Sequence, residues 1–173
     1  MKSLFFVLSI LLASFLNPSF SQVSSVVLGV DGLHCSACSF GTEKSIRQLD
    51  FVQDVKMDLN KHLAEITFKT GKNIDFDALA RKVEDAGFSL RSADVTYDFS
   101  HLAISNNSCY DDKNMIFSFI GIKDQQVLNG KHVVHLVGSD FMQKSEYKKW
   151  KLLLNTSCRK SDSLSKKVYQ VTL

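Results

Sequence analysis

The stretch "VSSVVLGVDGLHCSACS", residues 23–39, changes character halfway along its length. Its first eight residues are rich in valine and end at an Asp-Gly pair, as a strand followed by a turn does. Cys35 and Cys38 come next, in a chain that has only four cysteines. Apolar residues then recur with helical spacing at Phe40, Ile46 and Leu49. The stretch therefore predicts a strand, a loop that carries two cysteines, and a helix.

The next segments continue this alternation of strands and helices. Residues 52–59 and 63–69 alternate between two faces and are separated by a short polar stretch, which predicts a β-hairpin. Residues 74–87 repeat apolar positions on one helical face, carry acids in the first turn and end at a glycine. Residues 88–99 read as a closing strand. The order βαββαβ predicts an α+β protein with a ferredoxin-like domain.

The rest of the chain indicates a small β-rich α+β domain of unknown family. Strands are expected at 115–122 and 132–138, with Asn129-Gly130 as a turn between them. A helix is expected to start at Ser139 or Asp140 and to place Tyr147, Trp150 and Leu154 on one face. The last six residues, "VYQVTL", read as a final strand.

Charge supports a division of the chain into two modules. Residues 22–100 carry 9 Lys+Arg against 12 Asp+Glu, a net charge of −3, whereas residues 101–173 carry 11 against 6, a net charge of +5. Loop-forming residues are frequent at 98–107, where we expect the boundary. The predicted organisation is a signal peptide at 1–21, a ferredoxin-like domain at 22–100 and a second domain at 101–173.

The N-terminus predicts export. Lys2 precedes an apolar run of 13 residues, and a small-x-small cleavage site follows at Ser19-Phe20-Ser21. The run is shorter than the ~20 residues that a membrane span needs, although a short membrane anchor is the alternative. We therefore expect a periplasmic or secreted protein without a stable membrane span, cleaved before Gln22.

Cys35 and Cys38 are the candidate metal ligands. A metal-binding cysteine must be a thiolate, and free cysteine has a pKa near ~8.5 unless a helix N-terminus or a cation lowers it. Cys38 is expected at the start of a helix, whose N–H groups favour the anion. Two soft thiolates suit Cu(I) or another thiophilic ion, whereas calcium is a poor candidate. Zinc is less favoured because a closed site takes four ligands, and the nearest candidates to complete one, His34 and His62, read as exposed loop histidines rather than ligands.

Residues 23–97 resemble the heavy-metal-associated domain family. The family signature, Gly-Met-x-Cys-x-x-Cys after the first strand, is present as "GLHCSAC" at 32–38, with Leu33 in place of the methionine. The expected hairpin "VKMDLNKHLAEITF" and the helix end "VEDAGF" are also similar to the family pattern. The resemblance implies a metal-binding protein in which Leu33 is a buried support of the loop. It also implies a metal transporter or a metal-accepting protein as partner.

One position distinguishes subgroups within this resemblance. Cytosolic copper chaperones of the family carry a lysine just after the second helix, where this chain has Phe88. The chain therefore looks more like the metal-binding domains of heavy-metal P-type ATPases or like exported mercury-binding proteins. Cu(I) is the expected ion, and Hg(II) and Zn(II) are the alternatives. Phe88 is expected to pack against the metal loop.

The alternative function is an exported redox or disulfide-bearing interaction module that uses the ferredoxin-like domain as a scaffold. An oxidising compartment can close Cys35 and Cys38 into a disulfide that binds no metal. A thioredoxin-like enzyme is disfavoured, because such enzymes resemble one another in a cis-proline opposite the dithiol and the only proline here is Pro18.

Other features exclude several classes of function. No catalytic triad order, paired-carboxylate motif or phosphate loop is present, so an enzyme is not expected. The basic segment "KSEYKKWK", residues 144–151, is compatible with nucleic acid or a membrane surface, but export disfavours nucleic acid and such runs are usually solvated. Cys109 and Cys158 are expected to form a disulfide, since small exported modules depend on such crosslinks, and a second thiol pair for metal is the alternative.

Overall fold

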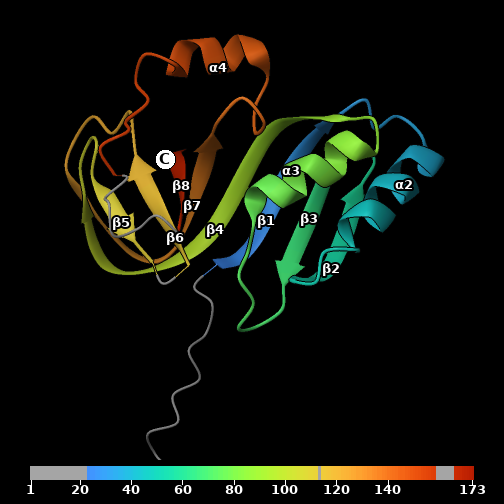
Figure 1. Cartoon of the computed structure of the whole chain (residues 1–173), viewed down its shortest axis with the longest axis horizontal. Coiled ribbons are helices and arrows are strands. Elements are labelled where there is room, and N and C mark those ends of the chain that lie inside the picture. The colour runs from blue at the N-terminus through green and yellow to red at the C-terminus, as the bar shows by residue number, and fades with distance from the viewer. Residues whose placement is uncertain (1–22, 113, 159–165) are drawn as a thin grey trace, which may run out of the picture.

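A mixed sheet of eight strands organises the chain, flanked by helices (Figure 1). The computed structural model describes residues 23–112, 114–158 and 166–173, so the predicted signal peptide lies outside the described residues. The order of strands across the sheet is β2-β3-β1-β4-β7-β8-β6-β5. The elements are β1 (Val23–Asp31), α2 (Ser36–Ile46), β2 (Val52–Asp58), β3 (Leu63–Phe68), α3 (Phe76–Asp85), β4 (Ser89–Ile104), β5 (Cys109–Asp111), β6 (Met115–Phe119), β7 (Gln126–Val137), α4 (Lys144–Trp150) and β8 (Lys167–Thr172).

The first six elements confirm the predicted ferredoxin-like plan. β1 lies in the middle of its half of the sheet and pairs antiparallel with both β3 and β4, and β2 completes the edge. The register places Val26 beside Ile66 on one side and beside Val95 on the other, and all three side chains are buried. Helices α2 and α3 cover one face of these strands (Figure 1). This arrangement places the loop after β1 at one end of the sheet.

The second half extends the same sheet rather than starting a new one. β4 has 16 residues and runs through the first part of the boundary expected at 98–107. β7 pairs antiparallel with β4 and with β8, and β8 pairs parallel with β6. The division into domains at 22–100 and 101–173 stays a prediction, and the continuous sheet means that both parts share β4.

Two local predictions for the second half were wrong. Asn129 and Gly130 form no turn between strands but lie inside β7, where Gly130 pairs with Phe99 next to an irregularity in β4. Gly130 has φ 79°, a conformation that glycine adopts without strain, so it fits this irregular pairing. The helix begins at Lys144 after Gln143, and not at Ser139 or Asp140, whose side chains hydrogen-bond to each other.

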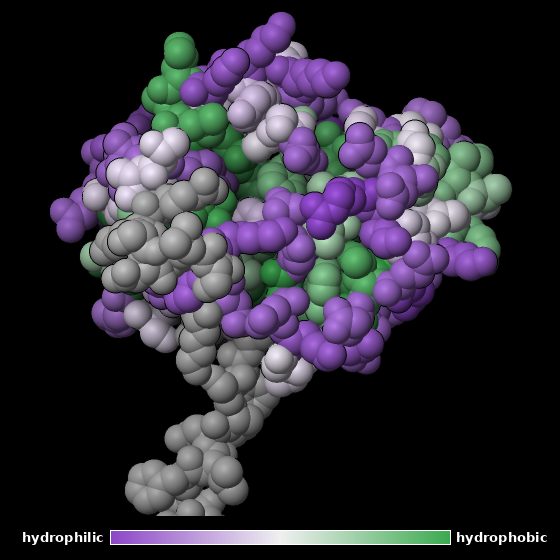
Figure 2. All heavy atoms as spheres, viewed as in Figure 1, coloured by the Kyte–Doolittle hydropathy of each residue, from purple (hydrophilic) through white to green (hydrophobic). Residues whose placement is uncertain are grey.

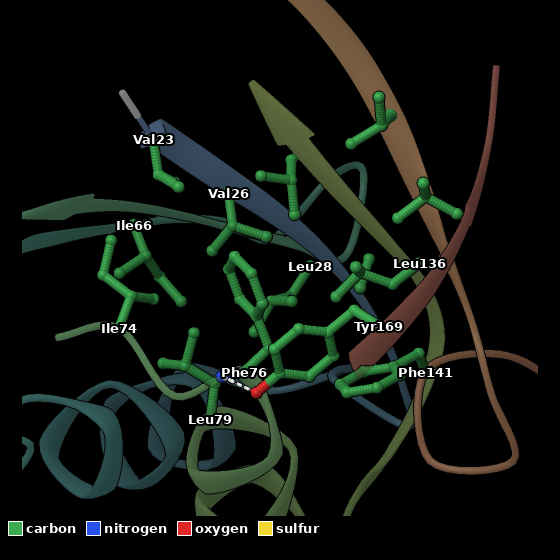
Figure 3. Close-up of a cluster of buried hydrophobic side chains, with 14 of the residues drawn as sticks. Val23, Val26, Leu28, Ile66, Ile74, Phe76, Leu79, Leu136, Phe141 and Tyr169 are labelled. Atoms are coloured by element: carbon green, nitrogen blue, oxygen red, sulfur yellow. Dashed lines mark hydrogen bonds between the residues drawn. The ribbon is translucent and has the colours of Figure 1, made fainter. Parts of the chain in front are cut away.

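The two halves share one hydrophobic core (Figure 3). Phe76, the first residue of α3, packs edge-on against Tyr169 of β8 with ring centroids 5.1 Å apart. The backbone N–H of Phe76 donates a hydrogen bond of 3.2 Å to the Tyr169 hydroxyl. Phe141, which precedes α4, contacts the other side of Tyr169 at a ring distance of 6.1 Å. The start of α3 is thus held by residues from the end of the chain.

Asp75 adds a polar contact at the same junction. Its carboxylate accepts a hydrogen bond from the Ala78 N–H at 3.1 Å, as an N-cap residue does, and another from Lys167 Nζ at 2.6 Å. Partial burial opposes the charged form, but the bonds from Lys167 and Ala78 outweigh it and lower the pKa of Asp75. The charged form of Asp75 therefore stabilises the fold.

We expect Asp75→Asn to destabilise the protein by about 0.5–1 kcal/mol at pH 7, because asparagine keeps the cap but loses the ion pair with Lys167. A carboxyl with a lowered pKa contributes above its unfolded value and loses that contribution as pH falls through its folded value. The difference between variant and wild type is therefore expected to shrink below about pH 4.

Urea unfolding at pH 7 and pH 3 measures this difference in the free energy of unfolding. Asp50→Asn, which breaks the more exposed pair with Lys72, is the matched control. A difference that grows at low pH would contradict this assignment.

Cys109 and Cys158 lie close together in the second half. The structure joins their sulfur atoms, with 5.5 Å between the Cα atoms and 49 positions between them in the chain. Cys158 is buried, and Cys109 is at the start of the short strand β5. Peptide mapping of the non-reduced protein is expected to recover the two cysteines in one crosslinked fragment. A free thiol at either position, with a metal ion bound there, would contradict that pairing.

Candidate metal site

The candidate site lies where β1 ends and α2 begins. Cys35 is the N-cap residue of α2, with extended backbone, and its Sγ accepts a hydrogen bond of 3.0 Å from the Cys38 N–H. The helix therefore starts at Ser36, earlier than the predicted start at Cys38. Cys35 thus lies in front of the free N–H groups of the helix, where the positive end of the dipole favours a thiolate.

The two sulfur atoms face each other across the first turn of α2. The structure joins Cys35 and Cys38, with their Cα atoms 5.2 Å apart. Cys35 is exposed, whereas Cys38 is partly buried against the core. Reduction of this bond releases two thiols at the surface, close enough to hold one ion between them. The oxidised pair has no thiolate to offer.

The loop before the cysteines packs against the protein through Leu33 and Gly32. Leu33 is 1% exposed, which agrees with its predicted role as a buried support. Gly32 has φ +89°, and a Cβ at this position would lie 3.1 Å from the Phe88 ring. A side chain at Gly32 would therefore be strained by the backbone and crowded by Phe88. This contact agrees with the predicted packing of Phe88 against the loop.

Phe40, predicted on the apolar stripe of the first helix, is not part of the core. Its side chain is 67% exposed, whereas Ile46 on the same helix is fully buried. The remaining buried positions of α2 are Ser39 and Thr42, and the Thr42 hydroxyl donates a hydrogen bond to the Cys38 carbonyl. Small polar residues thus bring the first turn of α2 close to the sheet and leave Phe40 in solvent.

In the part of the chain that the structure describes, the histidines do not complete a larger metal cluster. The rings of His34 and His62 meet edge-on at 4.8 Å between centroids, next to the cysteine loop. Within the described residues, no group of three or more His, Cys, Asp or Glu side chains is arranged to hold a metal ion. His135 is elsewhere on the sheet, with its Nδ1 2.7 Å from Asp94. The geometry around Cys35 and Cys38 therefore fits a two-ligand site better than a closed four-ligand site.

The second half of the chain reaches the base of the cysteine loop. The Gln143 side chain, from the residue before α4, donates a hydrogen bond of 3.1 Å to the Asp31 carboxylate at the end of β1. A cavity of about 600 Å³ lies beside this contact, and its lining includes Phe88, Arg81 and Lys144. No sequence signal pointed to the Gln143–Asp31 contact, because the two residues are 112 positions apart.

Comparison with known proteins places residues 27–89 under the description "Heavy-metal-associated domain". The chain is 31% identical over 88 residues to the mercuric transport protein periplasmic component of Acinetobacter calcoaceticus, an alignment that covers 51% of this chain and 93% of that protein. It is also 28% identical over 116 residues to a probable copper-exporting P-type ATPase of Archaeoglobus fulgidus, covering 66% of this chain and 13% of the ATPase.

Part of the chain is also similar to a solved structure. The yeast copper transporter domain, determined in apo and Cu(I)-loaded states, aligns with 39% of this chain and 90% of its own length, at 27% identity and a TM-score of 0.36. The family match runs from within β1 to the start of β4 and includes Cys35 and Cys38.

Proposed function

The chain belongs to the heavy-metal-associated domain family, and from this premise we propose that it is an exported carrier that binds one thiophilic metal ion, Cu(I), through the thiolates of Cys35 and Cys38. The ion is cargo, received from one protein and passed to another or sequestered. In this proposal residues 22–100 form the metal-binding domain, and residues 101–173 form a second domain that is joined to it through the sheet.

The observation that carries the proposal is the position of Cys35. Its sulfur caps α2 and accepts the Cys38 N–H at 3.0 Å, so the helix stabilises negative charge on the sulfur that is most exposed to an incoming ion. Cys38 supplies the second sulfur from the first turn of the same helix. The exposed Cys35 sulfur gives access to a partner protein, which a carrier requires.

The choice of ion follows from the donor set. Two thiolates that belong to no larger ligand cluster among the described residues suit a soft ion that accepts linear coordination, and Cu(I) and Hg(II) both do. Zn(II) would need further ligands, and the described residues provide no such cluster. Similarity to a mercuric transport protein and to a copper-exporting ATPase supports the same two ions. We propose Cu(I) as the physiological cargo and Hg(II) as a competitor for the same sulfurs.

Export is the second part of the proposal. It is supported by the predicted signal at residues 1–21 and by the similarity to a periplasmic component. Among the described residues, no helix has the length and apolarity needed to cross a membrane. A metal transporter or a metal-accepting protein is the proposed partner.

Native mass spectrometry tests the proposal on the chain from Gln22 onward. After selective reduction, we expect one Cu(I) per chain and a disulfide at Cys109–Cys158 only. The oxidised protein, with both disulfides closed, is expected to bind no Cu(I). Copper binding that is the same in the oxidised and the reduced protein would contradict the assignment of the site.

The bond between Cys35 and Cys38 supports a second candidate function. In that case the protein would be a disulfide-bearing interaction module whose ferredoxin-like domain is a scaffold. The two functions differ in which redox form of this pair acts. A redox module would exchange its Cys35–Cys38 disulfide readily with a thiol partner, whereas the carrier acts in the reduced form and passes its ion on without such exchange.

A further inference from the structure

We propose that the segment around α4 is a peripheral membrane-binding surface that recognises anionic lipid. The α4 patch, as we call it, combines exposed leucines with lysines at one end of the molecule. It consists of Lys144, Lys148, Lys149, Lys151, Leu152 and Leu153. Figure 2 shows apolar side chains next to strongly hydrophilic ones at the end where α4 lies in Figure 1.

The leucines are the first observation. Leu152 is 92% exposed and Leu153 is 49% exposed, directly after the last turn of α4. A single exposed leucine is ordinary on a protein surface. Two adjacent ones at a projecting position expose apolar area that only another surface can bury. Burial in the interfacial region of a bilayer would remove this area from water.

The charges select the kind of surface. Residues 144–154 contain four lysines and one acid, Glu146. Lys149 forms an ion pair with Glu146 at 2.7 Å, whereas Lys144, Lys148 and Lys151 have no ion-pair partner among the described residues. Lysines next to exposed leucines match the two components of an anionic bilayer, its headgroups and its acyl chains. A run of lysines alone would indicate a solvated surface. Lysines together with exposed leucines favour binding to lipid.

Trp150, the last residue of α4, contacts the protein next to the patch. Trp150 lies against Gly121, where an added Cβ would be 2.7 Å from the indole ring, so the ring faces the protein and not the solvent side of α4. Leu152 and Leu153 are left outside this contact.

The position of α4 connects the patch to the candidate metal site. Gln143, the N-cap residue of α4, donates a hydrogen bond to Asp31, and Asp31 precedes Cys35 by four positions. In Figure 1, α4 and the end of β1 both lie along the upper edge of the sheet. Docking of the patch would hold the cysteine loop close to the membrane, where metal transporters reside. This consequence rests on the proposed function, whereas lipid binding itself does not.

Vesicle co-sedimentation tests the proposal with metal-free protein that starts at Gln22, so that the apolar run of residues 4–16 is absent. The probes are vesicles of phosphatidylcholine alone and of phosphatidylcholine with phosphatidylglycerol at about 3:1. Binding is expected on the anionic vesicles, weakening at high salt, and at least about tenfold weaker on the neutral ones.

Two variants separate the contributions. Lys148→Gln with Lys151→Gln is expected to weaken anionic-vesicle binding by about thirtyfold, since each lysine near such a surface contributes about fivefold. Leu152→Ser with Leu153→Ser is expected to weaken it by at least about tenfold. The matched controls are Lys123→Gln with Lys131→Gln, and Leu59→Ser, which change exposed residues outside the patch. Both controls should bind as wild type does.

Several results would overturn the proposal. These are no binding to anionic vesicles, equal binding by the patch variants and the wild type, or equal loss in the controls. Concentration-dependent dimerisation in sedimentation equilibrium, abolished by the leucine variant, would assign the patch to a second copy of the chain instead. Because the assay contains no metal, its failure would leave the assignment of Cys35 and Cys38 unaffected.

Discussion

Replacing Cys35 or Cys38 by serine is expected to lower the affinity of the reduced protein for Cu(I) by more than about a hundredfold. Even groups that only orient a metal ligand contribute about 10- to 100-fold to affinity, and a two-sulfur site that loses one sulfur loses half of its donors. A serine hydroxyl is a hard donor that a soft ion does not favour. Competition with a chromophoric Cu(I) chelator under reducing conditions measures the change.

The same variants are expected to keep the fold. Cys35 is exposed, and a serine at this position still offers an oxygen that accepts the helix N–H, as serine does at many N-caps. Circular dichroism should therefore match that of the reduced wild type. His34→Asn and His62→Asn are the matched controls, because both rings lie beside the loop without belonging to a described metal cluster. Full Cu(I) affinity in either serine variant would remove that cysteine from the site.

The second large effect concerns the shared core. Phe76→Ala is expected to destabilise the protein by about 3–5 kcal/mol, because Phe76 is 1% exposed and its removal leaves a cavity against Tyr169. The loss of stability should also be detected by a probe in the second half of the chain. Trp150 is the only tryptophan, so its fluorescence in urea reports the unfolding of the second half, while circular dichroism reports the whole chain.

We expect the two signals to change together in the wild type and to move together in Phe76→Ala. Phe40→Ala is the matched control, since this phenylalanine is 67% exposed and its loss should cost less than about 0.5 kcal/mol. If the Trp150 transition stayed at the wild-type midpoint while the circular dichroism transition shifted, the two halves would unfold separately. That outcome would favour two independent domains over a common cooperative unit.

The ferredoxin-like half was predictable because its signals are local. Strand alternation in 52–69, the helical stripe in 74–87 and the Gly-x-x-Cys-x-x-Cys loop each lie within a short window of sequence. The burial of Leu33 was expected from the resemblance to the family signature, in which this position supports the loop. The prediction that Phe40 belongs to the buried face of the first helix was wrong. Helical spacing groups residues on one face, but it does not show which of them the rest of the fold covers.

The second half was harder because its structure depends on distant pairing. Asn129-Gly130 is a strong turn signal by itself. In the structure β4 continues past Phe99 and pairs with the β7 residues on both sides of Asn129-Gly130, so β7 does not turn there. The Ser139 hydroxyl donates a hydrogen bond to the Asp140 carboxylate, and neither side chain caps a helix. The contact between Gln143 and Asp31 spans 112 positions, and no periodicity in one sequence encodes such a distance.

The measurement that tests the central claim most directly is copper K-edge X-ray absorption of the reduced protein loaded with one Cu(I). The account predicts two sulfur neighbours and no nitrogen neighbour, a spectrum unchanged by His34→Asn or His62→Asn, and loss of loading in Cys35→Ser and Cys38→Ser. A first shell that contains histidine nitrogen, or a two-sulfur spectrum that persists in either serine variant, would contradict it.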